Sequence, residues 1–346
     1  MVEKETVTAG SNATKYYIRH TGQLMYGKLD FLHAAFGLVP PELDGYESTA
    51  DSPAFDILPS ADPNFILMTC LSKHTYLYQG NLADGSRKAK RVHVPTFLDM
   101  SLNIPNIEEQ YRIVLFLHTI DKLIAAAKKK ADLLKLKKRY YLQAIFGQRL
   151  RFKGFTKPWQ QRKLEELCIR VGSGGTPSVQ HPEYYNGKIP FLGISDLSGR
   201  AVSATQKKIT QRGLDNSAAW LVPKGSITLA MYASVGKVAI LDIELATSQA
   251  FFNMVIPEET CIRDFLFSRL EKADICHEWL PLISTGTQPN LNAAKLKDWE
   301  LKVPSTQERK TIGEFFHALD DLAAALARKI ELLERRKTAY LQRLFV

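Results

Sequence analysis

The strongest constraint on the fold of this chain is an internal repeat of two long amphipathic segments. Residues 104–146 align with residues 303–345 at a constant offset of 199, without gaps, and more than a third of the positions are identical. The triplet Tyr-Leu-Gln, for example, occurs at 141–143 and again at 340–342. Self-similarity at a fixed period indicates that the chain contains two copies of one structural unit.

Each copy has the apolar periodicity of a long helix, with steps of three and four residues that are typical of a heptad seam. Pro105 and Pro304 stand just before the two copies, where proline is tolerated. A helix of about 40 residues spans about 60 Å, and an amphipathic helix of that length needs a partner, so we predict that the two pair antiparallel. The residues expected to pair the helices or to dock another subunit are Ile113, Phe116, Ile120, Leu123, Leu134, Tyr141, Ile312, Phe315, Leu319, Leu322, Leu333 and Tyr340.

Weaker matches extend the repeat upstream. Gly22-Gln-Leu24 matches Gly225-Ser-Ile227, and residues 64–67 match residues 264–267. The predicted fold class is therefore α+β: two mixed α/β domains joined by two long antiparallel coiled-coil helices, with a pseudo-twofold internal repeat. The expected boundaries are 1–102 for a partial first domain, 103–153 for the first helix, 154–302 for the second domain and 303–346 for the second helix.

The second globule is predicted to be the more complete of the two. Short apolar runs at 189–195, 226–232, 237–242 and 250–256 are typical of strands, and the apolar spacing in 262–280 is typical of a helix packed on a sheet. Roughly 45 residues that open this globule have no counterpart in the first, so the first domain is expected to be shortened.

Charge is concentrated in one part of the chain. The net charge is +10, and residues 103–153 contain 12 basic and 4 acidic residues. Ten of the basic residues fall within 128–153, and such a field favours a polyanionic partner, of which nucleic acid is the first candidate. The four cysteines are far apart and no apolar run reaches the length of a membrane span, so a reduced, cytoplasmic protein is expected.

Catalytic and cofactor motifs are absent from the sequence. The Val-Gly-Lys at 235–237 lacks the other residues of a P-loop, and the glycines at 172–175 do not form a dinucleotide-binding fingerprint. Zinc-protease, serine-hydrolase and EF-hand motifs are missing, as is the Asn-Pro-Pro-aromatic motif of adenine methyltransferases. The sequence therefore predicts no enzyme activity, no catalytic residue, no metal and no cofactor in this chain.

Four motifs together resemble a known family. They are GGTPS at 174–178, EYYNGKIPFLGISDL at 183–197, STGTQPNL at 284–291 and KVPSTQER at 302–309, where the last leads into a long helix. With the helix repeat, they resemble the specificity (S) subunit of type I restriction–modification systems over residues 20–346.

The resemblance implies a non-catalytic DNA-sequence recognition subunit. Each of its two target recognition domains would read one half of a bipartite target in double-stranded DNA. The helices would hold the halves apart and dock two methyltransferase (M) subunits, which carry S-adenosylmethionine. Restriction (R) subunits would add ATP- and Mg-dependent cleavage, so the complex serves both restriction and DNA methylation.

The chain departs from the family pattern at its start. The first domain of the family opens with a tryptophan-containing strand and a GGTP-like loop, and the segment before Tyr16 has neither. Two alternatives therefore stay open: a truncated or rearranged subunit that reads only one half-site, and a coiled-coil adaptor without DNA specificity of its own. A self-sufficient methyltransferase or nuclease is disfavoured by the missing motifs.

Candidate DNA-binding residues follow from loop chemistry. Backbone N–H groups of small residues approach phosphates closely, while amides and hydroxyls reach base edges. In the second globule the candidates are Ser173, Gly174, Gly175, Thr176, Tyr232, Ser234, Lys237, Thr287, Gln288 and Asn290. In the first globule a basic run with interleaved aromatic residues supplies Lys73, Tyr76, Arg87 and Lys88.

Overall fold

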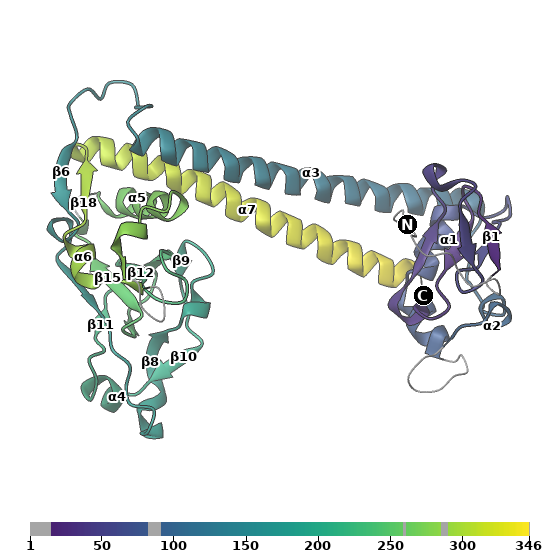
Figure 1. Ribbon diagram of the computed structural model, residues 1–346, viewed down its shortest axis with the longest axis horizontal. Helices are drawn as coiled ribbons and strands as arrows, with labels where there is room; N and C mark the ends of the chain where they lie inside the picture. The colour runs from purple at the N-terminus through teal and green to yellow at the C-terminus, as the bar shows by residue number, and fades with distance from the viewer. Residues whose placement is uncertain (1–14, 82–90, 259–260, 285–289, 346) are drawn as a thin grey trace. The chain divides into compact units, whose positions relative to one another are not determined.

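The computed structural model describes residues 15–81, 91–258, 261–284 and 290–345 (Figure 1). The chain forms two compact units. The first unit comprises residues 1–129 and 327–346, and the second unit comprises residues 130–326. No helix within the described residues combines the length and the hydropathy that a membrane span requires.

The two predicted helices are present as α3 (Ile107–Phe146) and α7 (Thr306–Leu344). Each unit contains one part of each helix. Both helices begin two residues after the predicted proline, and each has a side-chain cap near its N-terminus. Glu109 N–H donates to Asn106 Oδ1 at 3.0 Å, and at the equivalent position Glu308 N–H donates to Ser305 Oγ at 3.4 Å.

In the first unit α3 and α7 run antiparallel. The Phe116 and Tyr340 rings meet edge to face with centroids 4.9 Å apart, and Lys337 Nζ donates to Asp121 Oδ1 at 2.6 Å. A third contact, between Lys128 Nζ and a Glu334 carboxylate oxygen, is 2.7 Å long. As residue numbers rise along α3 they fall along α7, which defines the antiparallel sense.

The second unit repeats the same contacts at equivalent positions. Tyr141 and Phe315 meet edge to face at 5.1 Å, and Lys138 Nζ pairs with Asp320 Oδ1. Phe116 and Phe315 are equivalent in the repeat, as are Tyr141 and Tyr340. The predicted mixed α/β fold with two long antiparallel helices and an internal repeat is therefore confirmed.

The first unit is a small α/β assembly. Strands β3, β2 and β5 form an antiparallel sheet in that order, and β1 pairs with β4. Phe65 on α1 is buried and packs against Phe345 just after α7. The elements before α3 are β1 (Tyr16–Ile18), β2 (Leu24–Tyr26), β3 (Phe36–Leu38), β4 (Glu47–Thr49), β5 (Ala54–Phe55), α1 (Pro63–Cys70) and α2 (Val94–Leu98).

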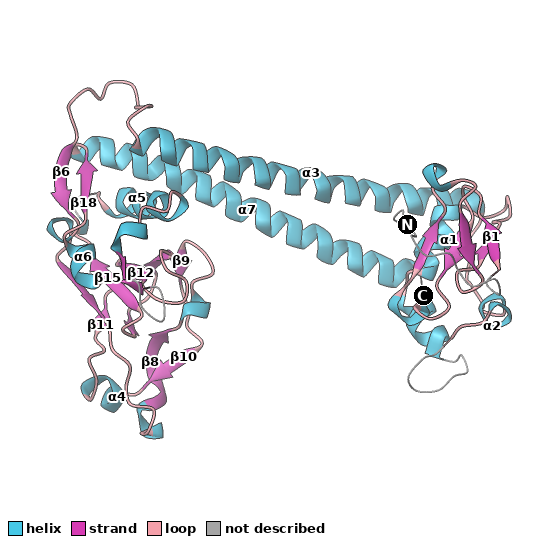
Figure 2. Ribbon diagram, viewed as in Figure 1, coloured by secondary structure: helices cyan, strands magenta, loops and turns pink. Residues whose placement is uncertain are grey.

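The second unit contains two larger sheets (Figure 2). One has the strand order β7-β15-β12-β13-β9, the other has the order β10-β8-β14-β11, and two short pairs are β18-β6 and β16-β17. The strands are β6 (Gln160–Lys163), β7 (Arg170–Ser173), β8 (Tyr185–Leu192), β9 (Ala201–Val202), β10 (Lys207–Ile209), β11 (Leu221–Val222), β12 (Ile227–Ala230), β13 (Val238–Leu241), β14 (Leu245–Thr247), β15 (Phe251–Val255), β16 (Ile283–Ser284), β17 (Asn290–Leu291) and β18 (Glu300–Val303).

Between α3 and α7, the described residues of the second unit form the α-helices α4 (Gln211–Asp215), α5 (Arg263–Ile275) and α6 (Ala293–Lys297). Helix α5 buries Phe265, Leu266 and Leu270 in the main hydrophobic core, together with strand residues such as Phe252 and Met254. The four strands and the helix that the apolar pattern predicts are all present as β8, β12, β13, β15 and α5.

Backbone hydrogen bonds show that the repeat extends through the sheets. Gly22 N–H donates to Val39 O at 2.9 Å, and Gly225 N–H donates to Leu241 O at 2.7 Å. Both glycines have a positive φ, +83° and +84°, which favours glycine because a Cβ would be strained there. The three strands β2, β3 and β5 of the first unit therefore correspond to β12, β13 and β15 of the second.

Candidate nucleic-acid interface

Loops that are far apart in the sequence lie close together at one end of the strands of the five-stranded sheet in the second unit. Ser173 at the end of β7 lies opposite Phe252, and Ala230 at the end of β12 lies opposite Phe251. Leu229 lies opposite Val238 at the start of β13. Three connections therefore leave the sheet at the same end of its strands: the loop after β7, the loop before β15 and the β12–β13 turn. We call this end of the sheet the loop edge.

The loop after β7 is held by close packing at its glycines. Gly174 and Gly175 are buried, and a Cβ at Gly174 would collide with the Thr247 carbonyl oxygen. At Gly175 a Cβ would lie 2.6 Å from the Ala218 backbone. Packing alone thus requires both glycines, whatever else the loop contacts. Thr176 is exposed, and its hydroxyl donates to Gln249 Oε1 at 2.6 Å.

The β12–β13 turn, residues 231–237, projects a lysine from the loop edge. Lys237 is exposed, whereas Tyr232 and Ser234 are half-buried. Gly236 has a φ of +93°, and a Cβ there would collide with the Asp274 carboxylate. Burial raises the pKa of Asp274, and the positive charges of His277 and Lys237 oppose that rise. Lys237 is thus held at the surface by a sterically fixed turn.

The β16–β17 pair lies against this turn. Leu291 N–H donates to Met231 O at 3.1 Å, which brings the neighbouring Asn290 to the loop edge. Candidates Thr287 and Gln288 lie outside the described residues. The structure thus brings together the described candidates of the second globule from three separate stretches of sequence.

Candidates of the first globule are less concentrated. Lys73 is exposed at the start of a short helical segment, and Tyr76 is half-buried against the aromatic cluster around Tyr26 and Phe31. Candidates Arg87 and Lys88 lie outside the described residues. Lys73 is therefore the described cation of this group that is available to solvent.

The predicted helix residues differ in their exposure. Ile120, Leu134 and Ile312 are buried, and Ile113, Leu319 and Leu333 are half-buried. Phe116, Tyr141, Phe315 and Tyr340 form the ring contacts described above. Leu123 and Leu322, however, are 49% and 42% exposed, so neither lies in a buried seam within its own unit. Instead, Val114, Leu117, Ile124, Leu142 and Ile145 are buried on α3.

The basic run of α3 and the following loop is partly neutralised. Lys138 donates to Glu271 Oε1 at 2.8 Å and pairs with Asp320, and its side chain is 16% exposed. Arg151 binds both carboxylate oxygens of Glu308, at 2.7 and 2.8 Å. Lys138 and Arg151 both hold carboxylates within the second unit, so the prediction that several basic residues of 128–153 face a polyanion rests on the other members of the run.

Sequence reasoning missed an ion network that joins the sheet, α5 and α7. Arg200, just before β9, donates to Asp320 Oδ2 at 2.8 Å and also pairs with Asp264 on α5. Its guanidinium lies 4.3 Å from the Phe267 ring centroid. The one available signal was the identity of Asp121 with Asp320 and of Lys138 with Lys337 in the repeat.

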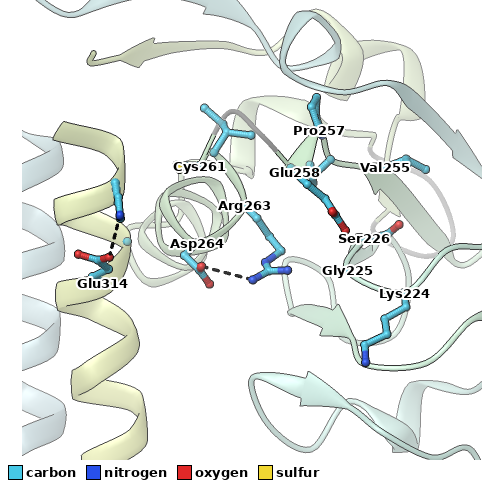
Figure 3. A pocket seen from close by; sticks show the side chains of 14 residues that line it. Lys224, Gly225, Ser226, Val255, Pro257, Glu258, Cys261, Arg263, Asp264 and Glu314 are labelled. Carbon is cyan, nitrogen blue, oxygen red and sulfur yellow. Dashed lines mark ion pairs between the residues drawn. The ribbon is translucent and has the colours of Figure 1, made fainter. Parts of the chain in front are cut away.

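A separate hollow of about 350 Å³ lies at the other end of the strands of the same sheet, away from the loop edge (Figure 3). It is bordered by Lys224, Gly225 and the end of β15, together with α5 and α7. Arg263 and Asp264 form an ion pair of 3.7 Å beside it, as Figure 3 shows. None of the DNA-binding candidates lines this hollow. Within the described residues, no group of three His, Cys, Asp or Glu side chains is placed to hold a metal ion.

The fold is that of type I specificity subunits. The HsdS subunit from Thermoanaerobacter tengcongensis aligns with a TM-score of 0.56 and 18% identity, covering 95% of this chain and 81% of that one. The type I S subunit from M. genitalium aligns with a TM-score of 0.57 and 15% identity, covering 100% and 92%.

Sequence comparison gives the family. Residues 156–335 match the type I restriction modification DNA specificity domain, and the chain therefore belongs to that family. It is 32% identical over 183 residues to the MjaIX specificity subunit of Methanocaldococcus jannaschii, which covers 52% of this chain and 42% of that relative. It is 26% identical over 322 residues to the EcoR124I/EcoR124II specificity subunit of Escherichia coli, which covers 87% and 76%.

Proposed function

We propose that this chain is the non-catalytic DNA-sequence recognition subunit of a type I restriction–modification complex. The observation that carries the proposal is the loop edge, where Ser173, Thr176, Lys237 and Asn290 come together from separate stretches of sequence. Family membership supports the same function, because the matched region spans both the second sheet assembly and most of α7.

The loop edge has the chemistry that duplex recognition requires. Hydroxyl and amide side chains can exchange hydrogen bonds with base edges, and an exposed lysine can neutralise a phosphate. Gly174 and Gly175 hold the backbone of the loop after β7 close to Thr247 and Ala218. The polar groups of this loop are therefore fixed in position before DNA binds. We propose Lys237 as a phosphate contact and Thr176 as a contact to a base edge or phosphate.

The proposed partners are double-stranded DNA with a bipartite target, two M subunits and R subunits. The repeated helix contacts support two similar docking surfaces for M, since equivalent residues pair in both units. S-adenosylmethionine would be bound by M, and ATP and Mg by R. The second domain would read its half-site with the higher specificity, because its sheet is the more complete.

The test is to express the chain with its M subunit and to map methylated sites across a genome, with variants of the loop edge. Lys237→Gln should weaken binding about equally on all sequences and reduce the salt slope by about 0.9. Thr176→Ala should change one half-site. The matched control is Lys302→Gln, an exposed lysine on β18. A complex without sequence-specific methylation, or a salt slope that Lys237→Gln leaves unchanged, would contradict the proposal and favour a protein-only adaptor.

A further inference from the structure

Three buried polar side chains lie beneath the loop edge of the second unit. Thr228 on β12, Thr247 on β14 and Asn253 on β15 are each 0% exposed. Asn253 stands between Phe252 and Met254, which are also 0% exposed. Burial of hydroxyl and amide groups in such a place is unfavourable unless each finds a hydrogen-bond partner. We call Thr228, Thr247 and Asn253 the buried polar set.

Asn253 is at the centre of this set. It lies opposite Thr228 in the pairing of β12 with β15, and opposite Gly172 in the pairing of β15 with β7. Thr228 Oγ1 donates to Asn253 Oδ1 at 2.9 Å. Asn253 Nδ2 donates to Thr247 Oγ1 at 2.7 Å and to Gly172 O at 3.2 Å. Because a backbone carbonyl can only accept, the amide nitrogen faces Gly172 O, and both ends of the amide have partners.

The buried polar set joins the two larger sheets. Strands β7, β12 and β15 belong to the five-stranded sheet, whereas β14, which carries Thr247, belongs to the four-stranded sheet. The amide of Asn253 therefore links three neighbouring strands of one sheet to a strand of the other.

The loop after β7 is held on two sides through Asn253. Just before the loop, the amide binds the carbonyl of Gly172. Within the loop, Gly175 N–H donates to the backbone carbonyl of Thr247 at 3.0 Å, and the side chain of Thr247 is the other partner of the amide. The exposed candidate Thr176 is the next residue. The position of its hydroxyl therefore depends on both anchors.

Hydrogen bonds in the first unit identify the equivalent strand positions. Lys28 N–H donates to Asp51 O at 2.9 Å, as Met231 N–H donates to Ala250 O at 2.8 Å. These bonds relate β2 to β12 at an offset of 203, and β5 to β15 at an offset of 199.

The first unit forms the same strand pair with apolar side chains. At these offsets Met25 is the equivalent of Thr228, and Ala54 is the equivalent of Asn253. Met25 lies opposite Ala54, as Thr228 lies opposite Asn253. Met25 is 5% exposed, so the position is buried in both units. The amide of Asn253 is therefore explained by the loop that it holds rather than by the pairing of the strands.

We propose that Asn253 is a positioning residue for DNA-sequence recognition. Its amide fixes the loop after β7 relative to both sheets and thereby sets the place at which Thr176 meets the DNA. Asn253 itself makes no contact with DNA, because its side chain is 0% exposed. This role rests on the proposed function of the loop edge, and it assigns part of the sequence specificity to a residue of the core.

A positioning role separates specificity from overall affinity. Bases are distinguished by hydrogen bonds of narrow geometry, whereas phosphates attract cations over a longer range. A loop released from Asn253 should therefore discriminate less well between bases, while Lys237 on the β12–β13 turn still neutralises a phosphate. A loss of folding would instead weaken binding to every DNA sequence.

The experiment measures binding by the full chain in complex with its M subunit. One set of duplexes carries the mapped target, and a second set carries single base-pair replacements in the half-site that the second domain reads. Asn253→Ala should reduce the ratio of the two affinities about tenfold at one or more positions. Affinity for unrelated DNA should change less than about twofold, and the salt slope should stay the same. Hydrogen exchange at residues 172–176 should become about tenfold faster.

Two further substitutions keep the core filled. Thr228→Met combined with Asn253→Ala installs the residue pair that packs in the first unit. Asn253→Asp keeps the size of the side chain and the acceptor for Thr228, but an ionised carboxylate cannot donate to Gly172 O. Both should lose discrimination as Asn253→Ala does, and the double variant should keep a urea midpoint close to that of the original chain.

The matched control is Ser226→Ala. This substitution removes a buried hydroxyl that has no hydrogen-bond partner within the described residues. It should leave both the discrimination between bases and the hydrogen exchange at 172–176 unchanged.

The outcomes separate this role from the proposed function. If the original chain with its M subunit recognises no specific sequence, the proposed function fails and the role of Asn253 fails with it. If the original chain is specific, the role of Asn253 is overturned by variants that keep full discrimination or unchanged exchange at 172–176. It is also overturned if discrimination falls only in proportion to the affinity for unrelated DNA. If Asn253→Ala does not fold, the double variant decides.

Discussion

The two units share a backbone plan but differ in how far it is buried. Strands β2, β3 and β5 repeat the hydrogen bonds of β12, β13 and β15, and the same ring and ion-pair contacts join α3 to α7 in each unit. Within the described residues, β6 and β7 pair with β18 and β15 in the second unit, whereas the described partner of β5 in the first unit is β2. The burial of a strand thus depends on the strand beside it rather than on its own sequence. Equivalent residues of the two units form matched pairs, and substitutions at each pair test this dependence.

The largest difference is expected at the strand that β6 covers. Leu301→Ala removes a side chain that is 3% exposed and should destabilise the second unit by about 3 kcal/mol. The equivalent Leu102→Ala removes a half-buried side chain and should cost about 1 kcal/mol or less in the first unit.

Each unit has its own reporter for this measurement. All four tryptophans, at 159, 220, 279 and 299, lie in the second unit, so their fluorescence follows its unfolding in urea. Cys70 is the cysteine of the first unit, and burial raises its pKa to about 12, so labelling of its thiol follows the unfolding of that unit. If Leu301→Ala and Leu102→Ala lowered the unfolding free energy of their units by the same amount, the difference in burial would be contradicted.

A second pair concerns the acid near the start of each long helix. Glu308→Ala leaves Arg151 and the Trp159 indole without their acceptor and should cost about 2 to 3 kcal/mol, less than for a fully buried pair because Arg151 is 27% exposed. Glu109→Ala changes an exposed residue and should cost less than about 0.5 kcal/mol. The same two reporters measure both variants. An equal loss of unfolding free energy for Glu109→Ala and Glu308→Ala would show that Glu109 is already covered.

The equivalent lysines Lys138 and Lys337 form a third pair. Lys138→Met should cost about 2 kcal/mol, because it leaves Glu271 and Asp320 without their cation in a poorly solvated place. Lys337→Met breaks a pair whose side chains are 32% and 44% exposed and should cost less than about 1 kcal/mol.

The pH dependence sharpens this third comparison. Burial raises the pKa of Glu271 above its ordinary value of 4.5, and the charge of Lys138 opposes that rise. Protonation of Glu271 therefore stabilises the folded unit; this contribution is fully present below pH 4.5 and is lost as the pH rises through the folded-state pKa. Lys138→Met should raise the pKa of Glu271 further. The loss of unfolding free energy that this variant causes should therefore shrink as the pH is lowered from neutral toward 4.5, which urea midpoints would measure. A cost in unfolding free energy that stays the same across this pH range would assign the loss to packing rather than to the unpaired Glu271 carboxylate.

The smallest effect is expected where the units are alike. Gly22→Ala and Gly225→Ala each place a Cβ at a φ near +84°, and neither would clash, because the nearest neighbour is Arg263 Nη1 at 3.6 Å from the Cβ at 225. Each should cost about 1 kcal/mol from backbone strain alone. Costs that differ by more than about 1 kcal/mol would show that the two turns are not equivalent.

Much of the fold follows from periodicity, and much of the candidate site does not. The repeat and its apolar spacing predict α3, α7, their pairing and four strands of the second domain, because regular elements depend on local sequence. The exposure of Leu123 and Leu322 could not be predicted in that way. The globules also pack on the helices, so α3 buries Val114 and Leu142 on a face that the seam pattern does not include.

By itself the sequence determined the internal repeat, the long helices, the family resemblance and the residue types of the recognition loops. Only the tertiary structure decided that Ser173, Lys237 and Asn290 meet at one edge, that Lys138 and Arg151 are held by carboxylates, and that Leu301 is more deeply buried than the equivalent Leu102. The physical reason is that the loop edge, the ion pairs and the burial of each strand depend on contacts between residues distant in the chain. Strand pairing fixes those contacts, whereas periodicity and composition report only on neighbours along the sequence.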